Sequence, residues 1–173
     1  MNNLYIRPIT LDDTDDIVRW RNSESVKINL FSQIHLTPEQ HIAYFKKNVE
    51  TGKCYQFIIV ADGESIGTVF LKNVDVKTKT AEFGIFIGEL HARGKGYASR
   101  ATRLILDYGF SNLFLNEITL SVFSDNIPAI KAYQKAGFLE KELHKDYVKR
   151  DSGSSDVLIM VITRDKWKKT RNV

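Results

Sequence analysis

Cysteine is almost absent from this sequence of 173 residues, since Cys54 is the only one. A single cysteine excludes a disulfide within the chain and favours a reducing compartment, so we expect a cytoplasmic protein. The four histidines have neither metal-ligand spacing nor cysteine partners, so the sequence predicts no metal site. No apolar run reaches the ~20 residues that a membrane span requires, and the first residues lack the pattern of a signal peptide.

Motifs of the nucleotide-binding folds are missing as well. The sequence has no phosphate-binding loop that ends in Lys-Ser or Lys-Thr, and Arg93–Ala98 contains Gly-x-Gly without the third glycine of the dinucleotide motif. The net charge is +4, but no predicted face interleaves basic with aromatic residues as nucleic-acid binding requires. The basic run Arg164–Val173 contains one aromatic residue, Trp167, and is predicted to be a solvated tail. We therefore expect neither a nucleic-acid nor a membrane partner.

The composition is that of one globular domain over residues 1–173, with 43% hydrophobic and 27% charged residues. Hydrophobic periodicity predicts the order strand, two helices, three strands, helix, strand, helix, two strands. Asp62-Gly63 predicts a hairpin turn, and Thr37-Pro38 with Gln40 predicts a capped helix start. Residues 23–36 are predicted to be irregular, and residues 150–155 to be the loop of a last hairpin. This order predicts an α/β (α+β) domain with a mixed sheet.

The stretch ELHARGKGYASRATRLILDYGF joins a predicted strand to a long amphipathic helix. A helix start leaves about four N–H groups unpaired and carries roughly half a positive charge, so acids would be expected there. Arg93, Lys95 and Arg100 add positive charge instead, while Gly94 and Gly96 permit a close backbone approach. The turn is predicted to bind a phosphate or pyrophosphate, with a merely solvated basic turn as the alternative.

Two motifs of this sequence resemble those of one family. Arg93-x-x-Gly96-x-Ala98 resembles the (Gln/Arg)-x-x-Gly-x-(Gly/Ala) motif of the GNAT acyl-CoA N-acetyltransferases, in its usual place between a strand and a long helix. The later stretch SVFSDNIPAIKAYQKAGF resembles the strand, Asn-containing turn, helix and Tyr-x-Lys-x-Gly-Phe ending of the same family. The resemblance covers nearly the whole chain. It implies the GNAT fold, with a mixed sheet splayed between two central strands, and an acetyl-CoA-dependent acyltransferase without a metal.

The resemblance also implies roles for single residues. Backbone N–H groups of the glycine turn would hold the CoA pyrophosphate, and one strand edge would pair with the pantetheine amides and stabilise the oxyanion of the tetrahedral intermediate. Asn126 would contact the pantetheine arm and cap the next helix. Tyr133 would protonate the departing thiolate, with a core tyrosine as the alternative. The turn residues are Arg93, Gly94, Lys95, Gly96, Tyr97 and Ala98, and the strand residues are Ile85, Phe86 and Ile87.

The acceptor amine must lose its proton before it can attack a thioester, because an alkylamine with a pKa near 10.4 is almost fully charged at pH 7. Glu82 begins the strand on the acceptor side, where several relatives carry a catalytic glutamate, and is our candidate general base, acting directly or through water. An ordinary ion pair is the alternative role of Glu82. Ser124 and His91 are lesser candidates.

The identity of the acceptor depends on the N-terminal part of the sequence. Glu82–Phe110 resembles bacterial spermidine acetyltransferases, whereas Val18–Lys47 resembles acetyltransferases of nucleotide-linked amino sugars; enzymes that acetylate protein N-termini form a third branch. Between Val26 and Asn48 the only acid is Glu39, which argues against a polyamine and favours the amino sugar. The residues taken over from the sugar branch are Trp20, Arg21, Asn22 and His41. A non-catalytic CoA-binding module is the alternative from another class, and relatives that pair through sheet edges suggest a homodimer.

Overall fold

One mixed sheet of seven strands organises the computed structural model, which describes residues 3–150 and 153–171. All neighbouring strands are antiparallel except β4 and β5, which run parallel. This arrangement confirms the predicted α/β fold with a mixed sheet. In sheet order the strands are β1 (Leu4–Pro8), β2 (Tyr55–Ala61), β3 (Glu64–Asp75), β4 (Thr80–Ile87), β5 (Glu117–Phe123), β7 (Gly153–Thr163) and β6 (Leu139–Arg150).

The helices follow the predicted order, with two additions. The predicted elements are α1 (Thr14–Asn22) preceded by the short turn η1 (Leu11–Asp13), α3 (Pro38–Tyr44) continued by η2 (Phe45–Val49), α4 (Tyr97–Ser111) preceded by η3 (Leu90–Ala92), and α5 (Ile127–Lys135). The additions are α2 (Glu24–Lys27), inside the segment predicted to be irregular, and α6 (Arg164–Arg171). Within the described part of the chain, no helix is both long and apolar enough to cross a membrane.

The prediction of a solvated tail is wrong for Arg164–Arg171. Trp167 is 8% exposed, packs against Phe110 with ring centroids 5.1 Å apart, and donates its Nε1–H to Asp107 Oδ1 at 2.8 Å. Burial of this one indole docks the helix although most of its other side chains are polar or basic and exposed. The last two residues of the predicted tail lie outside the described residues, as do residues 151 and 152 of the predicted hairpin loop. Gly153 and the two residues after it belong to β7.

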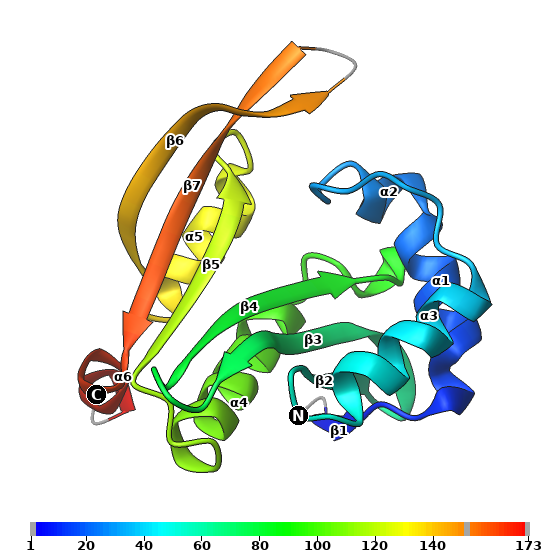
Figure 1. Cartoon of the computed structure of the whole chain (residues 1–173), viewed down its shortest axis with the longest axis horizontal. Helices are drawn as coiled ribbons and strands as arrows, with labels where there is room; N and C mark the ends of the chain where they lie inside the picture. The colour runs from blue at the N-terminus through cyan, green and yellow to red at the C-terminus, as the bar shows by residue number, and fades with distance from the viewer. Residues whose placement is uncertain (1–2, 151–152, 172–173) are drawn as a thin grey trace.

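Helices cover both faces of the sheet, as Figure 1 shows. Alternate residues of β2 face opposite sides, so Phe57 and Ile59 join the larger core under α4 and α5, whereas Ile58 and Val60 join the smaller core under α1. Both sides are buried, which explains the unbroken apolar run of this strand. The smaller core also contains Trp20, which is 1% exposed.

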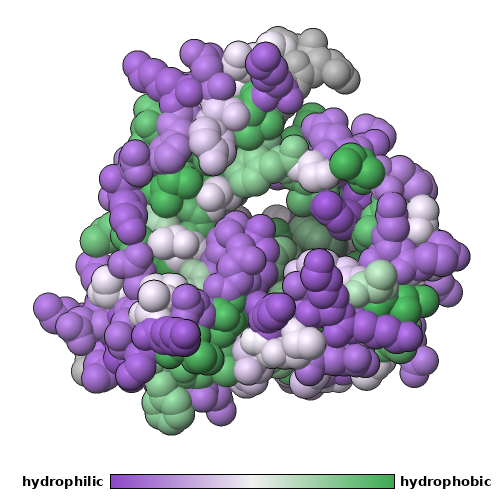
Figure 2. Space-filling view, viewed as in Figure 1, coloured by the Kyte–Doolittle hydropathy of each residue, from purple (hydrophilic) through white to green (hydrophobic). Residues whose placement is uncertain are grey.

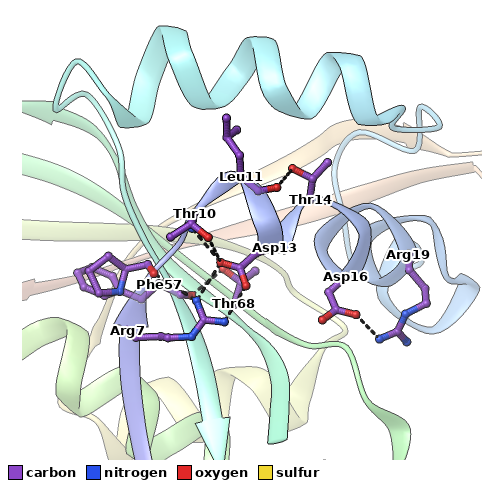
Figure 3. A network of polar contacts seen from close by, with 10 residues as sticks. Arg7, Thr10, Leu11, Asp13, Thr14, Asp16, Arg19, Phe57 and Thr68 are labelled. Carbon is purple, nitrogen blue, oxygen red and sulfur yellow. Dashed lines mark hydrogen bonds and ion pairs between the residues drawn. The ribbon is translucent and has the colours of Figure 1, made fainter.

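A polar network fixes the start of α1 (Figure 3). Arg7 donates to both carboxylate oxygens of Asp13, at 2.9 and 2.7 Å, and the Thr10 amide donates to Asp13 Oδ2 at 2.8 Å. Burial alone would raise the pKa of Asp13, but these hydrogen bonds outweigh burial and lower it. The next turn is closed by the Thr14 hydroxyl, which donates to the Leu11 carbonyl at 2.7 Å. This network anchors α1 to β1.

The sheet opens between its two parallel strands. β4 and β5 pair only from Thr80–Glu82 to Glu117–Thr119 and then diverge. One half of the molecule therefore contains β1–β4 with α1–α4, and the other contains β5–β7 with α5 and α6 (Figure 1). Figure 2 shows the surface hollowed between the two halves. The predicted splay between these two strands is confirmed.

Candidate active site

The glycine loop, defined as residues 93–96, leads into α4. Gly94 and Gly96 have φ angles of 74° and 78°, and a Cβ added to either would meet no atom within 4 Å. The first turn of α4 contains no acid. Open space, unpaired donors and the positive end of a 15-residue helix are the features that favour binding of an anion. The backbone N–H groups that have no acceptor among the described residues are those of Gly94, Lys95, Gly96, Ala98 and Ser99.

Arg93 fastens the loop rather than leaving it open. Its Nη2 and Nε donate to the carbonyl of Ile87 at 2.8 and 3.1 Å, and its guanidinium also reaches the carbonyl and hydroxyl of Ser25, at 3.3 and 3.2 Å. Its amide donates to Leu90 O at 3.2 Å. The free donors predicted from Arg93 to Ala98 therefore begin at Gly94, and Arg93 instead ties the end of β4 to α2.

The edge of β4 that faces β5 is open beyond Glu82. Gly88 donates its N–H to Ile66 O of β3 at 2.8 Å. Because successive residues of a strand point their N–H and C=O groups to opposite sides, those of Ile85 and Ile87 face away from β3, whereas those of Phe86 face β3. The carbonyl of Ile87 accepts from Arg93, in agreement with this direction. Of the three strand residues predicted to bind pantetheine, Phe86 therefore contributes no edge donor.

Tyr133 lies on α5 beside this opening. Its ring contacts Phe83 and Phe138 edge-on, with centroids 5.7 and 6.1 Å apart. Burial raises the pKa of Tyr133 to about 12, so the phenol is protonated at neutral pH. No described residue accepts a hydrogen bond from its hydroxyl. Tyr133 is thus a partly buried O–H donor that makes no hydrogen bond with the described residues.

Asn126 caps α5 as predicted and also reaches across the opening. Its Oδ1 accepts from the Ala129 amide at 3.3 Å, and its Nδ2 donates to Asn29 Oδ1 at 3.2 Å. Near this bond, Phe31 packs edge-on against Phe123 with centroids 4.7 Å apart. The segment between α2 and α3 therefore contacts the end of β5 on the other half of the molecule.

Glu82 is engaged by two donors of its own half. Lys72 Nζ lies 2.9 Å from Oε1, and Asn73 Nδ2 donates to Oε2 at 3.1 Å. The side chain is 29% exposed. A carboxylate held in this way can take a proton only through water or by giving up one of its two partners, so the direct form of the predicted base role has the weaker geometric support.

Three of the four residues predicted to bind the acceptor have side chains that make contacts within the protein instead. Trp20 is 1% exposed and donates Nε1–H to Glu89 at 2.7 Å, so its indole is not free to stack on a ligand. Asn22 exchanges two hydrogen bonds of 2.8 Å with the backbone of Leu36. His41 is 3% exposed beside Thr14 Oγ1 at 3.1 Å, and burial lowers its pKa. The interior thus holds side chains that the sequence suggested for an open pocket.

Arg21 differs from these three. Its side chain is half-buried beside Tyr44, and it has neither a hydrogen bond nor an ion pair with any described residue. Burial lowers the pKa of Arg21 below its ordinary value, while the Tyr44 phenol opposes this shift. A guanidinium keeps its charge even so. A half-buried cation without a partner is a group that an anionic ligand would stabilise.

One cluster brings three potential metal ligands together, since atoms of Glu64, Glu89 and His91 lie within 4.8 Å of one another. His91 Nε2 lies 3.0 Å from Glu64 Oε2. Glu89 is already paired with Arg19 at 2.6 Å, and this positive charge opposes a bound cation. We therefore assign no metal to the cluster.

The sequence predictions missed four residues that contact elements of the site: Glu89, Ser25, Asn29 and Phe31. They were missed because no local pattern in the sequence marks a partner that is distant in the chain.

The sequence of this chain is similar to those of known acetyltransferases. A family model described as acetyltransferase (GNAT) domain matches residues 3–139. The spermidine N(1)-acetyltransferase of Escherichia coli K12 is 31% identical over 147 residues, which cover 84% of this chain and 78% of the relative. Acetyltransferase PseH of Campylobacter jejuni is 30% identical over 132 residues, which cover 76% of this chain and 80% of that protein.

The fold has close counterparts among solved structures. The spermidine N-acetyltransferase of Vibrio cholerae, in complex with CoA and spermine, superimposes with a TM-score of 0.89 at 25% identity, covering 95% of this chain and 98% of that one. The splayed strands, the glycine loop at the start of α4 and the family match lead to one conclusion. The chain belongs to the GNAT family and is an N-acetyltransferase.

Proposed function

We propose that the protein transfers the acetyl group of acetyl-CoA directly to a primary amine of a small molecule in a ternary complex. The observation that carries this proposal is the position of the unpaired loop N–H groups beside the open edge of β4. The first group of donors fits a pyrophosphate, and the strand edge fits the amides of a pantetheine arm. The V. cholerae relative binds CoA, which supports the same ligand here.

Each residue of the opening has its own role in the proposed reaction. The amine nitrogen forms a bond to the thioester carbonyl carbon, and an N–H on the edge of β4, from Ile85 or Ile87, stabilises the resulting oxyanion. The carbon–sulfur bond then breaks, and the Tyr133 O–H gives its proton to the CoA thiolate. Before this attack the ammonium of the acceptor loses one proton through water toward Glu82, which frees the lone pair of the nitrogen. After the attack the nitrogen loses a second proton to solvent, and solvent returns a proton to the Tyr133 phenolate, so the products are a neutral amide and the CoA thiol. Asn126 holds the start of α5, which carries Tyr133.

A polyamine of the spermidine class is the first candidate acceptor. The curated relatives that resemble this chain include spermidine acetyltransferases of E. coli and V. cholerae, and the solved V. cholerae enzyme holds spermine. This evidence favours the polyamine over the amino sugar that the charge pattern of the N-terminal segment favoured. The scarcity of acids between Val26 and Asn48 is therefore a weaker guide to the acceptor than the similarity of the whole chain.

An amine that also carries an anionic group is the second candidate. The half-buried Arg21, which pairs with none of the described residues, would repel a polycation and attract a phosphate or carboxylate. The resemblance of Val18–Lys47 to acetyltransferases of nucleotide-linked amino sugars supports an amino sugar as such an acceptor, and the chain is also similar to acetyltransferase PseH. The two candidates differ in the sign of their charge, so a direct assay separates them.

The test is release of the CoA thiol from acetyl-CoA in the presence of spermidine, spermine, a UDP-linked amino sugar or an N-terminal peptide. Turnover with polyamines alone would establish the first candidate, and turnover with the amino sugar alone would establish the second. Turnover with the peptide would show that the acceptor is a protein N-terminus instead. Binding of acetyl-CoA without turnover of any amine, unchanged in Tyr133→Phe, would argue for a non-catalytic module.

The assembly of the protein is a separate part of the proposal. We expect at least a homodimer, and one solved V. cholerae relative is described as dodecameric. Sedimentation velocity on the purified chain, with and without spermine, tests this expectation, which a monomer at all concentrations would contradict.

A further inference from the structure

We infer that Glu89 is a positioning residue for the cofactor loop, which it fastens to α1 through the indole of Trp20. Glu89 follows the end of β4 and lies shortly before the first unpaired N–H donor, that of Gly94 in the residues described. It touches no reacting group of the proposed mechanism. The inference rests on the proposed CoA site.

The side chain of Glu89 accepts two short hydrogen bonds from α1. Glu89 Oε1 accepts from Trp20 Nε1 at 2.7 Å and from Arg19 Nη2 at 2.6 Å. The hydrogen bonds from Trp20 and Arg19 lower the pKa of Glu89, so it is a charged acceptor at neutral pH. The Glu89 side chain is 20% exposed, whereas Arg19 is 57% exposed, so the bond to the buried indole is the better shielded of the two.

The backbone next to Glu89 is shaped to fit the same indole. A Cβ on Gly88 would lie 2.1 Å from Cγ of Trp20, so the ring packs directly on the glycine backbone. The amides of Gly88 and Glu89 both donate to the Ile66 carbonyl, at 2.8 and 3.1 Å. Trp20 is 1% exposed in the smaller core, so this part of the chain is attached to a rigid support.

Besides Glu89, the segment before the loop is held by Ala92, whose small side chain is 2% exposed in the larger core, and by the exposed contact of His91 Nε2 with Glu64 Oε2 at 3.0 Å. Leu90 is 66% exposed, and the short turn η3 is closed by the bond from the Ala92 amide to the Glu89 carbonyl at 3.1 Å. Arg93 holds the far end of this segment through Ile87 and Ser25. Loss of the Glu89 side-chain bonds would leave the near end to its backbone bonds with Ile66, so this end would move more and the unpaired N–H groups would converge less well on one anion.

The test is the Kd for CoA, measured by calorimetry without an acceptor, in Glu89→Ala, Trp20→Phe and the double variant. We expect about tenfold weaker CoA binding in each single variant and no further loss in the double variant, because both remove the same bond. Glu89→Gln retains an acceptor oxygen for the indole and should bind CoA within about twofold of the parent. In steady-state assays the loss should appear in KM for acetyl-CoA, with kcat unchanged.

The control is Glu64→Ala, which removes a 54% exposed carboxylate and its contact with His91 of the same segment, but leaves the bond between Glu89 and Trp20 in place. It should bind CoA as the parent does. A purely structural role would instead lower the melting temperature of Glu89→Ala and leave its Kd for CoA unchanged, and this outcome would overturn the inference. So would additive losses in the double variant. A parent protein that does not bind CoA would overturn the proposed function itself, which keeps the two failures distinct.

Discussion

The glycine loop and the N-terminal helices α1–α3 differ in the groups that they offer to a ligand. The loop offers backbone N–H groups that have no acceptor among the described residues, and it does so at two glycines with positive φ and open space around them. The acceptor side offers side chains, and the fold has used most of them for its own contacts, as the burial of Trp20 and His41 shows. A backbone site follows from a short local motif, whereas a side-chain site depends on which way each helix is turned.

The largest expected effect separates catalysis from binding at the opening. Tyr133→Phe should reduce kcat by about 10²- to 10⁴-fold, because the thiolate would leave without its acid, and the Kd for CoA should stay within about twofold. The pKa of Tyr133 is raised to about 12, so the parent rate should not fall as the pH passes 10, where an ordinary tyrosine ionises. Single-turnover kinetics measure the first effect, and a pH profile of kcat measures the second. A Tyr133→Phe variant with the parent kcat would exclude the acid role.

A second prediction tests the backbone side of the comparison. Gly96→Val places a β-branched residue at φ 78° and crowds the anion site, so KM for acetyl-CoA should rise about tenfold or more. Gly63→Val is the matched control, because Gly63 has φ 86° in the β2–β3 turn and also has no atom near its missing Cβ. Both variants should lose about 1–2 kcal/mol of stability from the strained backbone. Equal KM values in the two variants would show that the effect is strain alone.

A third prediction tests the side-chain side. Arg21→Ala should raise KM for an anionic acceptor about fivefold to tenfold, since it removes the unpaired guanidinium. With spermidine the same change should leave KM unchanged or lower it, because a like charge is removed. The exposed Lys46 provides the control, and Lys46→Ala should alter neither KM. The direction of the Arg21 effect therefore distinguishes an anionic acceptor from a polycationic one.

The smallest effect on turnover is expected from the network that anchors α1. Asp13 has a lowered pKa, so its contribution to stability is present above the pKa near 3.8 of the unfolded chain and is lost as the pH falls through the folded value. Asp13→Asn should cost about 2 kcal/mol at pH 7, and its difference from the parent should shrink below about pH 3. Urea denaturation at several pH values measures this loss. A constant difference at all pH values would contradict the role of the ion pair with Arg7.

Local signals in the sequence were sufficient for most elements. Thr37 and Gln40 form the predicted capping box, with bonds of 3.3 and 3.0 Å, and Asp62-Gly63 forms the predicted turn, with both φ angles positive. The tail prediction failed at α6, because nothing near Trp167 in the sequence shows that its indole will be buried beside Phe110. Helix propensity depends on the residues of the segment alone, whereas packing of that helix on the protein depends on the surface against which it lies.

By itself, the sequence determined the family motifs, the order of the strands and of the helices other than α2 and α6, and the glycine loop at the start of α4, because each of these depends on residues adjacent in the chain. Only the tertiary structure decided that Trp20 supports Glu89, 69 residues away, and that Asn126 meets Asn29 across the opening. It also decided that Arg21, one residue after a buried indole, has no hydrogen-bond or ion-pair partner among the residues that the structure describes. A helix turns about 100° per residue, so neighbours such as Trp20 and Arg21 enter different environments, and only packing reveals which environment each one enters.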